Sequence, residues 1–391
     1  MQYSSIIKRI FASFILKFLG SLCGFLTIVI TARFLGAEGR GEVALFVNLL
    51  NLILAFTSTF SSSFSYVVGN LKYQVQKVFN LAILLNLFFL PILLYLFSLF
   101  HYKYFMFIIL IFLFANVLYY IEGLGYGIDN FRLVNIIRNV PSILTFVFTF
   151  LFLNYKQDVS LAIFSNVLGF FIVFLFVFPN FLKFLNFRVN FQLLKIIIRH
   201  GVFIALSTLT TFLLYRVDFF LIEKFYSKKE LGIYSIAVSI GDINSIILSF
   251  IITAVLGKFF SQDGKKVLEQ SIVIIWIFQI LGIVSFLIFG KLFINLVFTP
   301  EFSTAYLPSL ILLISTAIYN PSSIIAVYVN VILGKTYIPF IISLISLIFK
   351  FFLSLFLIIE LSLVGASISC LISYTLTFSI YAFVYFKLIK N

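Results

Sequence analysis

The chain has 391 residues, of which 63% are hydrophobic and only 10% are charged. Soluble domains carry about 25% charged and about 45–50% apolar residues, so this composition excludes a soluble globular protein and predicts an integral membrane protein. The formal net charge of +14 is typical of basic cytoplasmic loops in a membrane protein. We therefore expect membrane lipids, and no nucleic acid, as partners.

Apolar windows of about 20 residues, separated by polar or Gly/Pro clusters, predict twelve membrane-spanning helices. The first six are residues 10–32, 43–68, 78–99, 104–126, 138–154 and 160–182. The second six are residues 201–222, 232–257, 270–290, 305–332, 338–359 and 362–386. The predicted fold class is thus an all-α polytopic membrane protein, and these helices leave no room for a soluble catalytic domain.

Basic residues are distributed unevenly between the two sides that these spans define. Sixteen lysines and arginines fall on the side of the N-terminus and eight on the opposite side. Because cytoplasmic loops carry the excess of basic residues, this bias places both termini in the cytoplasm. The first apolar stretch is too long for a signal-peptide core, so it is expected to stay as a spanning helix.

The longest cytoplasmic connection lies near the middle of the chain and carries basic residues on an apolar frame. It predicts an amphipathic linker, 183–200, between an N-terminal six-helix lobe, 1–182, and a C-terminal six-helix lobe, 201–391. An offset of 191 residues aligns FLGAEGRGEVA with FYSKKELGIYS and superposes Gly41 on Gly232. The two lobes are therefore expected to be parallel repeats, as in some transporters.

Two segments carry a resemblance to a known family. The segment after the first span reads ITARFLGAEGRGEVALFVNLLNLILAF, and residues 216–240 read RVDFFLIEKFYSKKELGIYSIAVSI. They resemble the first and the seventh-to-eighth helix signatures of the Wzx-type O-antigen flippases. These lipid-linked oligosaccharide flippases are the polysaccharide transporter branch of the multidrug/oligosaccharidyl-lipid/polysaccharide exporter superfamily.

The resemblance implies two lobes around a central cavity that opens alternately to either side of a bacterial inner membrane. It implies a flippase rather than an enzyme, without a cofactor. The cargo would be an undecaprenyl diphosphate-linked oligosaccharide, an O-antigen or capsule repeat unit, moved from the cytoplasmic to the periplasmic leaflet. Coupling to H⁺ or Na⁺ and contact with other polysaccharide-assembly membrane proteins are also expected.

Ionisable groups at membrane depth are the candidates for the site, because each costs about 2.5–3.5 kcal/mol to insert and must face protein or water. Lys17 in the first span and Lys350 near the centre of the eleventh are candidates to hold the cargo diphosphate by charge-assisted contacts. The alternative for Lys17 is snorkelling to a headgroup. For Lys350 it is a buried pair with a carboxylate.

Arg216 and Asp218 lie two residues apart in the seventh span and so point about 200° apart, which means that each needs its own partner. Arg216 is the third candidate for diphosphate binding, because its planar fork suits a diphosphate; an interhelical salt bridge is the alternative. Asp218, Asp242 and Glu122 are candidates for ion coupling or gating. Asp242 is the strongest of these candidates because it lies near the membrane midplane. The alternative role for Asp242 is a simple hydrogen bond between two helices.

The tenth span contains Asn320 and Pro321 near its centre. Because proline removes a backbone hydrogen bond, we expect a kink there that acts as a hinge or bends passively. The chain has two cysteines and two histidines, far apart in sequence, so no metal site is expected.

Two other functions stay open. An ion-coupled exporter of small cationic compounds would share this architecture, but acidic residues would dominate its cavity. A membrane glycosyltransferase, polymerase or ligase would need acid or base groups, for which Glu38 and Glu42 are the candidates. It would also need a substantial extracytoplasmic loop, which the sequence lacks.

Overall fold

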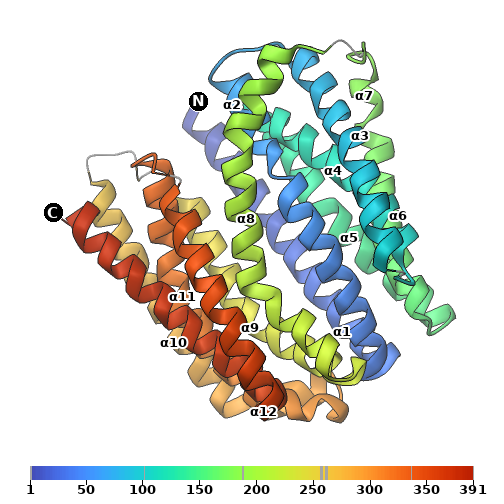
Figure 1. The fold of residues 1–391 in the computed structure, drawn as a ribbon, viewed down its shortest axis with the longest axis vertical. Helices are drawn as coiled ribbons and strands as arrows, with labels where there is room; N and C mark the ends of the chain where they lie inside the picture. The colour runs from blue at the N-terminus through green and yellow to red at the C-terminus, as the bar shows by residue number, and fades with distance from the viewer. Residues whose placement is uncertain are drawn as a thin grey trace. The chain divides into compact units, whose positions relative to one another are not determined.

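The computed structural model of the chain describes residues 2–100, 102–186, 189–255, 259, 263–335 and 337–390. Over these residues it contains helices and their connections but no strand (Figure 1). Ten of its helices are long and apolar enough to cross a membrane. The predicted fold class, an all-α polytopic membrane protein, is confirmed.

The helices follow one another with short connections. In the first half they are α1 (Gln2–Thr57), α2 (Phe60–Gly69), α3 (Val75–Phe100), α4 (Phe105–Gly127), α5 (Phe131–Tyr155), α6 (Val159–Val177) and α7 (Pro179–Leu182). In the second half they are α8 (Phe191–Phe225), α9 (Lys228–Val255), α10 (Gly264–Val297), η2 (Pro300–Ala305), α11 (Tyr306–Val331), α12 (Tyr337–Tyr385) and η3 (Phe386–Lys390).

Two stretches, Phe14–Gly69 with 56 residues and Tyr337–Leu388 with 52, are each more than twice as long as one crossing of about 20 residues requires. Each contains a residue with non-helical backbone angles: Gly36 in α1, with φ of 65°, and Ser362 in α12, with φ of 51°. The predicted spans lie on either side of these two bends. The ten helices therefore provide the length for the twelve predicted crossings.

The chain divides into two compact units. Unit 1 contains Met1–Phe34 and Phe46–Thr208, and unit 2 contains Leu35–Leu45 and Leu209–Asn391. Within the predicted linker 183–200, Phe187 and Arg188 lie outside the described residues, and α8 continues without a break from Phe191 into the seventh predicted span. The division into lobes at 182 and 201 stays a prediction.

Unit 1 is built around α4, most of whose residues are buried. Its apolar core contains residues of α2, α3, α4 and the first turns of α8. Asn80 of α3 anchors the connection that precedes α8, because its side chain bonds the Phe184 carbonyl at 2.9 Å and accepts from the Asn186 amide at 2.9 Å. These bonds attach the connection to α3 and provide hydrogen-bond partners for two of its backbone groups.

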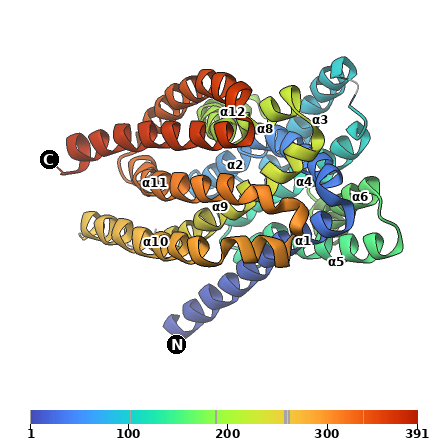
Figure 2. The same ribbon diagram turned by 90° about the horizontal axis from the view of Figure 1, so that it is seen from below.

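Unit 2 is held together by polar contacts as well as by apolar packing. Its helices α10, α11 and α12 run alongside one another (Figure 2). Hydroxyl groups at nearly equal distances before and after the bend at Ser362 pair within α12, so its two arms are antiparallel. A further pair joins α12 to α8. The three pairs, each at 2.8 Å, are Ser354–Ser369, Ser346–Thr377 and Thr210–Ser343.

The two glycines that the internal alignment superposes are in direct contact inside unit 2. A Cβ atom on Gly41 would overlap the Lys228 carbonyl oxygen, and one on Gly232 would overlap the Ala37 carbonyl oxygen. The same 191-residue offset relates Ala37 to Lys228, so the contact is reciprocal. Small residues allow this close backbone approach, and the reciprocity supports the alignment of the two halves.

Candidate functional site

Unit 2 contains two ion pairs that link α8 to α9 and to α12. A terminal nitrogen of Arg216 lies 2.5 Å from Asp242 Oδ2, and Lys350 Nζ lies 3.4 Å from Asp218 Oδ2. Arg216 and Asp218 thus each have their own partner, as their angular separation on α8 requires. The structure brings together four of the predicted site residues in these two pairs.

The Lys350–Asp218 pair is fully enclosed. The side-chain exposures are 0% and 1%, and Lys350 Nζ also donates to the Leu214 carbonyl at 2.8 Å. Asp218 accepts hydrogen bonds from the Tyr234 hydroxyl and, at 3.2 Å, from the Cys370 thiol. A buried pair is tolerated only when such additional bonds satisfy both charges. For Lys350, the structure therefore shows the carboxylate-paired alternative.

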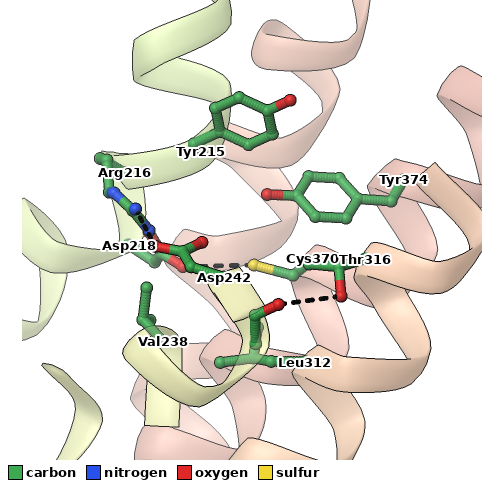
Figure 3. Close-up of a pocket in the computed structure, with 10 residues that line it drawn as sticks. Tyr215, Arg216, Asp218, Val238, Asp242, Leu312, Thr316, Cys370 and Tyr374 are labelled. Carbon is green, nitrogen blue, oxygen red and sulfur yellow. Dashed lines mark hydrogen bonds and ion pairs between the residues drawn. The ribbon is translucent and has the colours of Figure 1, made fainter. Parts of the chain in front are cut away.

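The Arg216–Asp242 pair is more accessible, with side-chain exposures of 22% and 40%. It borders a cavity of about 10 Å³ that Tyr215, Thr316 and Tyr374 also line (Figure 3). Because that volume corresponds to about one water molecule, the cavity holds neither a sugar nor a diphosphate in this conformation. A ligand larger than water could reach the pair only if the surrounding helices separated.

Aromatic residues surround this cavity, and sequence reasoning missed them. The ring centroids of Tyr215 and Tyr319 lie 5.2 Å apart, and those of Tyr319 and Tyr374 lie 4.8 Å apart. Cys370 and Tyr374 lie four residues apart on one face of α12, and this spacing is the signal that could have revealed them. Both residue types count as apolar in hydropathy windows, which hid that signal.

The predicted hinge lies inside α11, which is one helix from Tyr306 to Val331 with Pro321 in it. Asn320 is buried and accepts a long hydrogen bond, 3.5 Å, from the Ser245 hydroxyl of α9. Among the described residues, its amide nitrogen has no hydrogen-bond partner. The hinge stays a prediction.

The remaining predicted site residues lie in unit 1. Glu122 of α4 pairs with Arg138 of α5, with Nε and Oε1 2.5 Å apart, and the side-chain exposures are 6% for Glu122 and 58% for Arg138. Lys17 of α1 is half-buried and interacts electrostatically with Arg138. In the sequence, Arg138 is the first residue of the fifth predicted span, 138–154, and it was not among the predicted site residues.

Glu38 and Glu42, the candidates for a catalytic role, lie just after the bend at Gly36. Glu42 is bound by the Lys228 ammonium group at 2.5 Å, and Glu38 is exposed. In the part of the chain that the structure describes, no group of three or more His, Cys, Asp or Glu residues could hold a metal ion.

Comparison with known proteins gives one family and a set of similar folds. Residues 6–262 match the model of a family described as polysaccharide biosynthesis protein, and no curated protein matches the sequence. A multidrug resistance MATE family transporter of the MOP superfamily, in an inward-facing conformation, aligns with a TM-score of 0.71 and 15% identity over 95% of this chain and 96% of its own.

Two other solved structures are similar. The lipid II flippase MurJ, in an inward closed conformation, has a TM-score of 0.68 and 16% identity over 96% of this chain and 87% of its own. The MATE transporter VcmN of Vibrio cholerae, in its bent form, has a TM-score of 0.64 and 16% identity over 98% of this chain and 97% of its own. At these identities the likeness shows a shared fold.

Proposed function

We propose that this chain, which belongs to the polysaccharide biosynthesis protein family, is a flippase for a lipid-linked oligosaccharide. The family match carries the proposal, because it covers residues 6–262 of a chain built from membrane-spanning helices. The shared fold with a lipid II flippase supports it. The proposed cargo is an undecaprenyl diphosphate-linked O-antigen or capsule repeat unit, moved to the periplasmic leaflet of a bacterial inner membrane.

The accessible pair of unit 2 is the proposed place where the cargo and the coupling ion act. Arg216 presents a planar fork that suits the two oxygens of a phosphate group, and it can exchange Asp242 for the cargo diphosphate when the cavity opens. Asp242, once released, is a carboxylate that can bind H⁺ or Na⁺. Lys350 can reach cargo only in a conformation in which it is separated from Asp218. We propose that Asp218 helps to gate the transition to that conformation.

Charge-removing variants in liposomes test these roles. Arg216→Gln and Asp242→Asn should each lower the rate of translocation at least about tenfold, the loss expected for one charge-assisted interaction. Asp242→Asn should also remove the response to an imposed proton or sodium gradient. Lys291→Gln, a charge removal on the exposed Lys291 of α10, is the control. Wild-type rates and gradient responses in both variants would refute the proposed roles.

Export of small cationic compounds is the second candidate, favoured by the likeness to MATE transporters. It requires carboxylates that are free to bind a cation. In unit 2, however, Asp218 and Asp242 both pair with basic side chains. Uptake of a cationic dye into inverted vesicles, abolished by Asp242→Asn, would support the exporter over the flippase.

A further inference from the structure

The stretch from residue 39 to residue 69, in α1 and α2, exposes polar residues although it contains the second predicted span. Several of its large apolar side chains, among them Phe60, Phe64 and Val67, are buried in the core of unit 1. The structure describes all of these residues, and the two exposed ones among them are Asn51 and Ser62. This stretch therefore packs an apolar face against the protein and presents a polar face to its surroundings.

Helix α10 shows the opposite pattern in the same chain. Between residues 273 and 289, every exposed residue except Ser285 has a large apolar side chain, which is the surface expected against lipid tails. An amide or hydroxyl group that faces lipid finds no hydrogen-bond partner there, and its burial is costly. We therefore expect the face of Asn51 and Ser62 to contact water or a polar ligand rather than lipid.

Asn51 lies deep in the membrane-spanning part of the chain. By helical rise it is about 22 Å beyond the bend at Gly36 and about 27 Å before Gly69, where α2 ends. The hydrocarbon core of a bilayer is about 30 Å thick, so Asn51 is far from the bulk water on either side. A polar group that contacts Asn51 is therefore inside the membrane, where a cargo in transit would be.

Ser58 continues the same face between Asn51 and Ser62. The spacings of seven and four residues correspond to about two turns and one turn of helix. The helix is interrupted at Ser58 and Thr59, whose hydroxyl groups donate to the carbonyls four residues before them at 2.5 and 2.6 Å, in competition with helical bonds. Thr59 keeps helical backbone angles, φ of −66° and ψ of −21°, so the face continues across the interruption.

The chemistry of this face suits an uncharged ligand. From Val43 to Gly69 the sequence contains no lysine, arginine, histidine, aspartate or glutamate. The side chains of Asn51 and Ser62 make no hydrogen bond to any described residue, so both are open to a ligand. An asparagine amide and a serine hydroxyl can each donate and accept, which matches the hydroxyl groups of a sugar.

We propose that Asn51, Ser58 and Ser62 form a binding face for the sugar hydroxyl groups of the cargo during its passage through the membrane. The ligand is the neutral, hydroxylated part of a lipid-linked oligosaccharide. Asn51 contributes most, because its amide provides two donor hydrogens as well as an acceptor. The inference rests on the proposed flippase function, because that function brings an oligosaccharide to this depth.

Labelling of cysteine variants in nanodiscs by a membrane-impermeant maleimide tests whether the face contacts water. Asn51→Cys and Ser62→Cys should each react at least about tenfold faster than Leu281→Cys, because a thiol must meet water to form the reactive thiolate. Leu281→Cys is the matched control, since Leu281 is exposed on the apolar surface of α10. The wild type supplies the background of Cys23 and Cys370. Reaction of Asn51→Cys and Ser62→Cys at the rate of Leu281→Cys would overturn the proposal.

Protection from labelling tests the ligand. Undecaprenyl diphosphate-linked oligosaccharide in the nanodisc should slow the labelling of Ser62→Cys, and undecaprenyl diphosphate without sugar should not. Adding Asn51→Leu should raise the cargo concentration needed for protection about three- to tenfold, the effect of one hydrogen bond. Asn154→Leu, the same change at an exposed asparagine near the end of α5, is the control and should leave protection unchanged. No protection by the cargo, or equal protection by the lipid without sugar, would overturn the sugar assignment.

Translocation by the wild type and by Asn51→Leu separates this inference from the proposed function. If the wild type moves the oligosaccharide and Asn51→Leu neither slows this movement nor weakens protection, the binding face fails and the flippase proposal stands. If the cargo protects Ser62→Cys but the wild type moves none of it, the flippase proposal fails and the binding face stands.

Discussion

The buried pair of Lys350 and Asp218 is the most constrained feature at the scale of single residues. Both side chains are at most 1% exposed, and each charge would be costly in the membrane interior without the other. The Leu214 carbonyl, the Tyr234 hydroxyl and the Cys370 thiol provide the further bonds. The pair therefore stabilises the contact of α8 with α12 whatever it contributes to transport.

Removing one partner of this pair should destabilise the protein more than removing both. Lys350→Met leaves Asp218 as an uncompensated buried charge, and such losses cost about 3–5 kcal/mol. Adding Asp218→Asn removes that charge, so the double variant should recover most of the stability. Melting temperatures measured in detergent should therefore be lowest for Lys350→Met, higher for the double variant and highest for the wild type. A Lys350→Met protein with the melting temperature of the wild type would show that the pair contributes nothing to stability.

The sequence reveals these charges but not what they touch. A lysine or aspartate in an apolar window stands out, so Lys350, Asp218, Arg216 and Asp242 could be identified as candidates. Their partners depend on which helices pack together, and hydropathy does not encode that. Cys370 was not recognised because it has the pattern of a core residue.

At the scale of helices, the bends and one close crossing organise the chain. The sequence predicts two spans around residue 36 and two around residue 362, separated by loops, and the structure joins each pair through a single non-helical residue, Gly36 or Ser362. Hydropathy locates the apolar lengths correctly. It does not distinguish a polar loop from a bend, because polar residues mark both.

The crossing of Gly41 with Gly232 predicts a sharp difference between two similar substitutions. Gly41→Ala places a methyl group on the Lys228 carbonyl, so the two backbones must separate at a cost of about 1–3 kcal/mol. Gly24→Ala, in the same helix, has no atom within 4 Å of the new Cβ and should be neutral or slightly stabilising. Equal melting temperatures for the two variants would contradict the close crossing.

A substitution that restores the missing backbone donor can distinguish a functional hinge in α11 from a passive bend. Pro321→Ala supplies an N–H group that closes the interrupted helical bond, so a functional hinge becomes stiffer and translocation should slow without a loss of stability. Pro91→Ala, which makes the same change inside α3, is the control. An unchanged rate in Pro321→Ala would exclude the hinge.

At the scale of the whole molecule, the family match and the shared fold both support the proposed flippase function. The chain belongs to the polysaccharide biosynthesis protein family, and both a lipid II flippase and MATE transporters share its fold. A catalytic alternative loses one of its two candidate groups, because Glu42 is paired with Lys228. The membrane class could be predicted from composition and the helices from the apolar windows of the sequence, whereas the partners of the charged residues required the structure.

The most direct test of the flippase proposal is the movement of a labelled undecaprenyl diphosphate-linked oligosaccharide across liposomes that contain the purified protein. The labelled sugar is then probed from the outside by a membrane-impermeant reagent. We predict that the protein speeds the exchange of cargo between leaflets and leaves the recovered cargo chemically unchanged. No increase over protein-free liposomes, or recovery of lengthened or cleaved cargo, would contradict it.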